Sequence, residues 1–240
     1  MKKTITVITL SLLFVSAINA QNWGNKKIKG NGNVISETRN TEDYDGIKCA
    51  GSMDFILVSG TEGKITIEGD SNLLEYIMTE VKNGNLIIKV KKGINLSSSK
   101  TIRITIPFQD INAISLAGDG DLKNKDTIKS NDLSVSLAGS GDIKLNVKTN
   151  TIKCAIAGSG DMTCNGDTND LEVKVAGSGD FHGFDLQAEN TDVAVAGSGD
   201  AKVVSNRALK ARVAGSGDIV YKGSPEKDAK VAGSGSVKAD

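Results

Sequence analysis

The sequence has few aromatic residues, two prolines, one histidine and no excess charge of either sign. Aromatic residues make up 4% of the chain, and 29 basic side chains balance 29 acidic ones. A neutral chain gives no electrostatic reason to expect binding to nucleic acid or to an anionic membrane. The single histidine, His182, follows a predicted turn on a polar face, so a Ser-His-Asp triad has no suitable base. The scarcity of aromatic rings indicates a repetitive core of small aliphatic side chains.

The first twenty residues, "MKKTITVITLSLLFVSAINA", have the pattern of a secretory signal peptide. Lys2 and Lys3 precede an apolar stretch that is short for a membrane span, and small Ala17 and Ala20 follow it. We expect cleavage after Ala20 and export to the periplasm, the cell surface or the medium. A membrane anchor is the alternative, although no later run is apolar enough to span a bilayer.

The three cysteines are Cys49, Cys154 and Cys164. Their spacing matches no zinc pattern, and an odd number leaves at least one unpaired in an oxidising compartment. Each occupies an apolar position of a strand pattern, which favours buried thiols that act as small hydrophobic side chains. A bridge between Cys154 and Cys164 is the alternative.

A pentapeptide recurs through the second half of the chain. Ala-Gly-Ser-Gly-Asp begins at five alanines, and the variants Ala-Gly-Asp-Gly-Asp and Ala-Gly-Ser-Gly-Ser begin at two more. The seven starts are Ala117, Ala138, Ala157, Ala176, Ala196, Ala214 and Ala232. They lie 18 to 21 residues apart, and a period near twenty residues indicates a solenoid.

The residues around each pentapeptide alternate between apolar and polar. Apolar side chains stand one and three residues before the alanine and one residue after the motif, which predicts half-buried strands on both sides of a glycine turn. We therefore predict an all-β fold, a parallel and right-handed β-solenoid with one turn and one polar corner per coil. A flat antiparallel meander is the alternative, but it would leave one apolar face uncovered.

The front of the chain is less regular. We expect a flexible leader over residues 21–33, including Trp23, and an irregular β-rich region over 34–108 that caps a regular solenoid over 109–240. Within the cap, "CAGSMDFILV" at 49–58 resembles a degenerate copy of the repeat. Asn83-Gly84 predicts a hairpin, and Asp70 or Ser71 a cap for a helical turn from Leu73.

The order of these segments resembles a known family. The similar features are "YDGIKCAGSMDFILV", "ITIEGDSNLLEYIMTEVKNGNLIIKV", "IRITIPFQDINAISLAGDGDL" and the Gly-Ser-Gly-Asp series, which together cover about 34–237. They resemble the head GIN domain proteins, exported bacterial β-helical proteins labelled "putative auto-transporter adhesins". The resemblance implies a β-helical fold and a location in the cell envelope. It implies no proven activity and supplies no catalytic residues.

One acidic residue recurs at the end of each complete motif. The column consists of Asp121, Asp142, Asp161, Asp180, Asp200 and Asp218. Calcium-binding β-rolls use a related motif with a nonapeptide period, but here no residue separates the second glycine from the aspartate. We expect aspartates that are satisfied by turn amides, with no cofactor and no metal, and a calcium ladder is the alternative.

These observations predict an exported, non-enzymatic binding or scaffold protein of the cell envelope. Its repeated faces would bind a glycan or an envelope or surface protein in an adhesin-like manner. We also expect association into a homo-oligomer through the C-terminal coil end. A calcium-dependent β-roll-like module and a carbohydrate-active β-helix enzyme are the alternatives.

Overall fold

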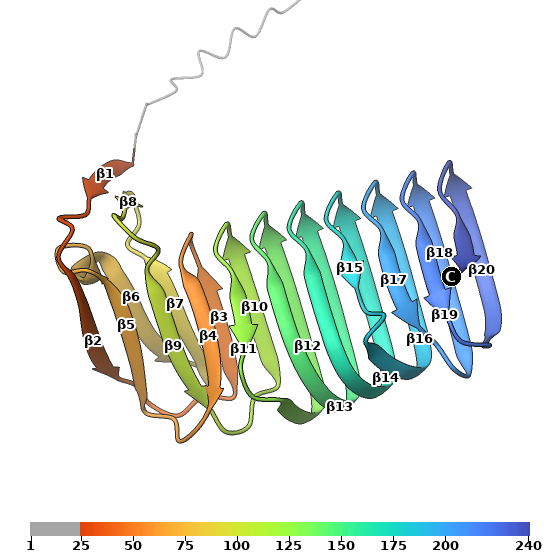
Figure 1. The fold of residues 1–240 in the computed structure, drawn as a ribbon, viewed down its shortest axis with the longest axis horizontal. Helices are drawn as coiled ribbons and strands as arrows, with labels where there is room; N and C mark the ends of the chain where they lie inside the picture. Colours follow the sequence, from red (N-terminus) through yellow and green to blue (C-terminus); the bar gives the residue numbers. More distant parts are fainter. Residues whose placement is uncertain (1–24) are drawn as a thin grey trace, which may run out of the picture.

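The computed structural model describes residues 25–240 as a β-solenoid whose coils stack along one axis (Figure 1). The predicted signal peptide, 1–20, and Trp23 lie outside the described residues. Across 25–240, no helix has the length and hydropathy needed to cross a bilayer. Each coil contributes a strand to a first wall, passes through a narrow Gly-Ser-Gly turn and returns along a second wall. A wider corner then leads into the next coil.

The strands of each wall stack in one continuous order along the axis. The first wall contains, in order, β6 (Ile77–Lys82), β7 (Asn85–Val90), β3 (Gly46–Ala50), β10 (Ala113–Gly118), β12 (Ile128–Gly139), β13 (Ile143–Gly158), β14 (Met162–Gly177), β16 (Leu186–Gly197), β18 (Ala208–Gly215) and β20 (Glu226–Gly233). The second wall contains β2 (Val34–Asn40), β5 (Lys64–Asp70), β9 (Arg103–Phe108), β4 (Asp54–Ser59), β11 (Leu122–Asn124), the first parts of β13 and β14, β15 (Phe181–His182), β17 (Ala201–Val204), β19 (Ile219–Lys222) and β21 (Val237–Ala239).

The coils are parallel and in register at the repeated motif. Ala138 pairs with Ala157 and Ala176 with Ala196, which confirms the solenoid and excludes the antiparallel meander. The degenerate copy at 49–58 also stacks as a coil, because β3 pairs with β10 and β4 with β11. Parallel stacking therefore begins at Gly46, well before the boundary expected near Gln109.

The core is a strip of mainly aliphatic side chains between the two walls, with Phe55 and Phe181 also fully buried. Residues at the predicted inward positions are buried in almost every coil, from Ile114 to Ile219, while the last coil leaves Val231 45% exposed. Cys154 and Cys164 face each other in one coil with their Sγ atoms 4.0 Å apart. Contact with Cys164 and burial raise the pKa of the Cys154 thiol. All three cysteines are buried and unbridged, as the buried-thiol prediction expected.

Antiparallel strands complete the N-terminal end of each wall. β6 pairs with β7 through the predicted hairpin, in which Asn83 and Gly84 have φ values of 50° and 69°. β5 pairs with β9 and with β2 at the same end of the other wall. These strands continue the hydrogen bonding of both walls past the first coil.

Two details of this region differ from the sequence expectations. The helical turn exists as η1 (Leu74–Tyr76), but no side chain caps it. The buried carboxylate of Asp70 instead accepts hydrogen bonds from the backbone amides of Gly32 and Ser99 and from the Ser99 hydroxyl. Within the expected flexible leader, β1 (Lys26–Lys29) forms a parallel ladder with β8 (Ile94–Ser97). Both differences arise from contacts between segments that are distant in sequence.

The narrow turn requires glycine at two positions. Gly177 has φ +129°, a conformation that other residues rarely adopt, and a Cβ on Gly179 would overlap the carbonyl oxygen of Gly160 in the preceding coil. The amides of Ser178 and Gly179 both donate to the carbonyl of Gly158, at 2.9 and 3.1 Å. Successive turns are therefore hydrogen-bonded backbone to backbone, with no space for side chains between them.

We expect Gly179→Ala to destabilise the fold by more than about 2 kcal/mol, because its methyl group must push two coils apart. The matched control is Ser178→Ala in the same turn, where the side chain is exposed, and its effect should stay within about 0.5 kcal/mol. Denaturant unfolding of both variants measures the difference. Equal stability of the two variants would contradict the backbone-to-backbone stacking.

Candidate functional site

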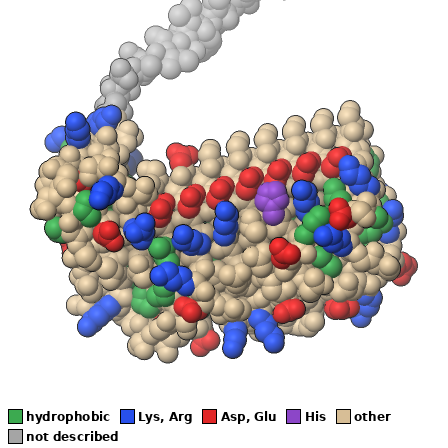
Figure 2. Space-filling model, viewed as in Figure 1, with side chains coloured by type: hydrophobic (Ala, Val, Ile, Leu, Met, Phe, Trp, Pro, Cys, Tyr) green, Lys and Arg blue, Asp and Glu red, His purple; other side chains and the backbone are tan. Residues whose placement is uncertain are grey.

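The aspartate column forms a continuous ladder on the second wall, next to the narrow turns. Figure 2 shows it as a row of acidic side chains along the length of the solenoid. The strand ladders hold successive coils in register on both sides of the turn, so consecutive aspartates are neighbours. Asp54 extends the column by one coil, since Phe55 pairs with Leu122. The degenerate "AGSMD" motif could have revealed Asp54 in the sequence, but Met53 replaces its second glycine.

From Asp121 onward, each carboxylate of the ladder is bonded to the next coil. The Oδ1 atoms of the aspartates from Asp121 to Asp200 each accept the backbone N–H of the following aspartate, at 2.7 to 3.1 Å. At the end of the ladder, Asp218 Oδ1 accepts the amide and the hydroxyl of Ser236, each at 2.8 Å. The turn amides therefore satisfy one oxygen of each carboxylate and join neighbouring coils. The second oxygen of each carboxylate is not used in these contacts.

A second column runs beside the ladder, two residues after each aspartate from Asp121 to Asp218 and two residues after Ser236. It consists of Lys123, Lys144, Thr163, His182, Lys202, Val220 and Lys238, which pair with one another in register. Lys238 lies 3.2 Å from Asp218, and the hydrogen bonds from Ser236 and Lys238 hold the pKa of Asp218 below its usual range. At this end of the ladder, the Lys238 ammonium therefore offsets part of the repulsion on Asp218. Thr163 and His182 interrupt the lysine column side by side.

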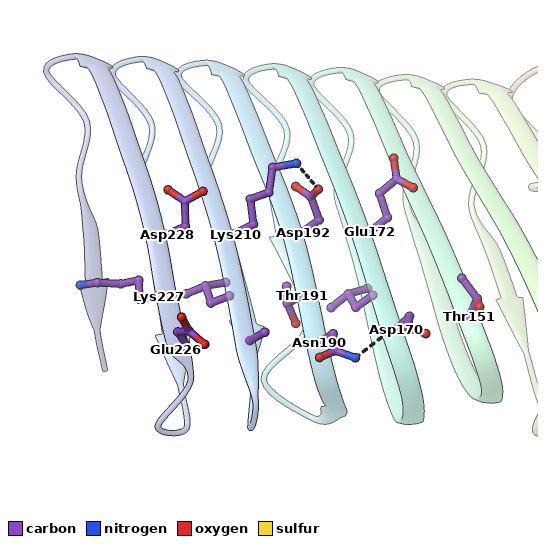
Figure 3. A pocket seen from close by; sticks show the side chains of 13 residues that line it. Thr151, Asp170, Glu172, Asn190, Thr191, Asp192, Lys210, Glu226, Lys227 and Asp228 are labelled. Atoms are coloured by element: carbon purple, nitrogen blue, oxygen red, sulfur yellow. Dashed lines mark hydrogen bonds and ion pairs between the residues drawn. The ribbon is translucent and has the colours of Figure 1, made fainter.

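A groove on the first wall crosses β14, β16, β18 and β20. Its volume is about 520 Å³. The nearly buried side chains of Leu171, Thr191 and Leu209 form the floor. Polar side chains rise on both sides, and Figure 3 shows ten of the thirteen lining residues by name. The groove and the ladder occupy different walls, because one precedes the narrow turn and the other follows it.

Hydrogen bonds fix several groups around the groove. Asn190 donates to Asp170 at 2.8 Å, and Lys210 donates to Asp192 at 2.6 Å (Figure 3). Arg212 pairs with Asp228 and holds the pKa of that carboxyl below its usual range. The groove thus offers carboxylate, amide, hydroxyl and ammonium groups over an apolar floor. Nothing in the sequence marks this groove, because outward polar residues occur on every strand.

The chain resembles known proteins over most of its length. The model of a family described as "Putative auto-transporter adhesin, head GIN domain" matches residues 43–225. A solved structure from Bacteroides fragilis NCTC 9343, described as a "putative adhesin", has 23% identity and a TM-score of 0.83, with 89% of this chain and 100% of that chain covered. No curated protein matches the chain.

Two structures from Parabacteroides distasonis ATCC 8503 are also similar. One, described as a "Putative lipid binding protein", has 29% identity, a TM-score of 0.76 and coverage of 90% of this chain and 100% of that chain. The other, described as a "putative adhesin", has 27% identity, a TM-score of 0.71 and the same coverage. These structures share the solenoid with its N-terminal region, so the fold extends beyond the repeats.

We expect the ladder to lose stability in acid. The pKa of Asp218 is lowered in the folded state, whereas an aspartate in an unfolded chain has a pKa of about 3.9. The unfolded state therefore binds more protons near this pH, so the contribution of Asp218 is present above about pH 4 and lost as the pH falls below it. Thermal unfolding between pH 7 and pH 3 should show this fall. Asp218→Asn, which cannot titrate, should flatten it, and Ser236→Ala should give an intermediate slope. An unchanged slope in Asp218→Asn would refute this assignment.

We expect the stability of the ladder to be independent of calcium. Calcium prefers six to eight oxygen ligands, whereas one oxygen of each ladder carboxylate already accepts a backbone amide. Melting curves in excess calcium and in excess chelator should coincide, because a ligand stabilises a fold only by binding it. A clear rise in the melting temperature with calcium, reduced by Asp142→Asn, would instead establish the calcium-ladder alternative.

Proposed function

The chain belongs to the family described as "Putative auto-transporter adhesin, head GIN domain", and from this membership we propose that it is an exported, non-enzymatic binding protein of the cell envelope. An adhesin-like family implies an extracellular or surface location, in agreement with the predicted signal peptide. The proposed ligand is a glycan, held in the groove across β14, β16, β18 and β20. The observation that carries this proposal is the row of hydrogen-bonding groups over the floor of Leu171, Thr191 and Leu209.

The chemistry of the groove suits a hydroxyl-rich ligand. Asp170, Asn190 and Asp192 present planar acceptors and donors on adjacent strands, and Lys210 adds an ammonium group. Ligand sites combine a largely apolar surface with a few oriented polar groups. Sugar hydroxyls can exchange hydrogen bonds with these side chains. The strands repeat at about 4.8 Å, so an extended polymer can cross several strands of the groove.

A protein and a lipid are weaker candidates for this groove. A stable protein partner would need an interface well beyond this groove, because specific interfaces bury more than about 1,000 Å². An acyl chain would need an apolar cavity, whereas charged side chains border this groove. The lipid-binding description of the similar Parabacteroides distasonis protein therefore enters the test as an alternative outcome.

The binding test compares two walls of the same protein. Purified mature protein is assayed on immobilised bacterial polysaccharides, on envelope proteins and on phospholipid vesicles. We expect binding to a polysaccharide, and Asn190→Ala combined with Asp192→Ala should weaken it by about tenfold or more, since each lost hydrogen bond to a charged or polar group costs on the order of 1 kcal/mol. Lys144→Ala on the ladder wall is the matched control and should bind like the parent.

Three outcomes would contradict the proposal. Equal binding by the groove variant and the parent would place the ligand elsewhere, and binding to vesicles or proteins alone would replace the glycan. Release of new reducing ends from a bound polysaccharide would favour the carbohydrate-active enzyme. Melting curves of both variants separate lost contacts from lost folding.

A further inference from the structure

Asp161, Asp180 and His182 form a compact cluster on the ladder wall. Their potential ligand atoms all lie within 4.8 Å of one another, and all three side chains are partly buried. Asp180 and His182 are two residues apart on one segment, so both project from the same face. Asp161 occupies the matching position on the preceding coil, because Met162 pairs with Phe181. Two ligands from one strand and a third from its neighbour thus converge on one point of the surface.

Backbone contacts orient both carboxylates before any ligand arrives. Asp161 Oδ1 accepts the amide of Asp180 at 2.8 Å, and Asp180 Oδ1 accepts the amide of Asp200 at 2.7 Å. This leaves Oδ2 on each aspartate for another partner. Asp161 Oδ2 and His182 Nε2 are 3.9 Å apart, too far for a hydrogen bond. A cation about 2.0–2.2 Å from each atom would bridge them after small rotations of partly exposed side chains.

The imidazole distinguishes this step from the rest of the ladder. Pairs of neighbouring aspartates recur in every coil, so two carboxylates alone do not mark a site. At most other positions the adjacent column holds a lysine, whose positive charge opposes a bound cation, and Val220 is the exception. At this step the column holds Thr163 and His182, which pair in register, so an imidazole takes the place of a lysine ammonium group. Lys202 follows His182 on the next coil, on the side away from Asp161.

We propose that Asp161, Asp180 and His182 bind a divalent transition-metal ion of the zinc class, with at least one coordination position open to solvent. Two carboxylates and one imidazole form a mixed oxygen and nitrogen set, which suits zinc better than calcium. Three protein ligands with an open fourth position are typical of zinc sites that bind an exogenous group. The site lies on the wall opposite the groove, so it does not depend on the proposed glycan binding.

The test uses zinc itself and the mature protein, stripped with a chelator and dialysed. Isothermal titration calorimetry should show one zinc ion bound per chain and no comparable heat with calcium. His182→Ala should lose this binding. Thr163→Lys should also lose it, because it restores the lysine column next to the imidazole. Lys202→Ala should bind more tightly than the parent, since a nearby positive charge is removed.

Asp142→Asn is the matched control, because it removes a ladder carboxylate one coil away and leaves all three ligands in place. It should bind zinc like the parent. The parent failing to bind zinc, or His182→Ala binding it with unchanged affinity, would overturn the site. Equal loss in Asp142→Asn and His182→Ala would indicate diffuse binding along the ladder and would overturn it as well. Melting curves check that each variant is folded. We expect them to fold, because the substituted side chains are partly exposed.

Discussion

The close approach of successive turns is the constraint on which the rest of the structure depends. At each narrow turn, two amides of one coil donate to a glycine carbonyl of the coil before it, and the next aspartate amide donates to the preceding carboxylate. Any side chain on the two glycines would separate the coils. The turn therefore sets the spacing and the register of the stack. With the register set, inward residues of one strand stack on inward residues of its neighbour. A shift of one residue would exchange the two faces of the strand.

This stacking explains why so small a set of side chains is sufficient for the core. Opposite walls face each other within one coil, so each apolar residue meets both a partner across the coil and its equivalents in the coils above and below. Val, Ile, Leu and Ala fill this strip, and the paired thiols of Cys154 and Cys164 occupy two of its positions. Backbone hydrogen bonds run along the whole axis, and the antiparallel strands β6, β5 and β2 continue them at the N-terminal end. The outward residues are thereby free to vary between coils.

That freedom produces two chemically different faces. On the second wall, the aspartate ladder is hydrogen-bonded to the backbone through Oδ1, and beside it runs a column of lysines interrupted by Thr163, His182 and Val220. On the first wall, polar groups with little repetition surround the shallow groove. The regular face stabilises the stack. At His182 it also brings two carboxylates and an imidazole close together. The irregular face has the variety of donors and acceptors that recognition of a polymer requires.

The sequence by itself determined the class of the fold and the position of every complete turn. The period, the glycines and the two-residue alternation are local signals. They predict the coil length, the turns and the inward-facing residues of each strand. Only the tertiary structure decided the contacts between distant segments. It placed Asp70 against Gly32 and Ser99 instead of at a helix end, paired β1 with β8, and started the stack at Gly46. It also aligned the polar residues of four coils into a groove and brought His182 beside Asp161. Such contacts depend on which coils are adjacent and on where each side chain points. The spacing of residues within one repeat carries no information about either.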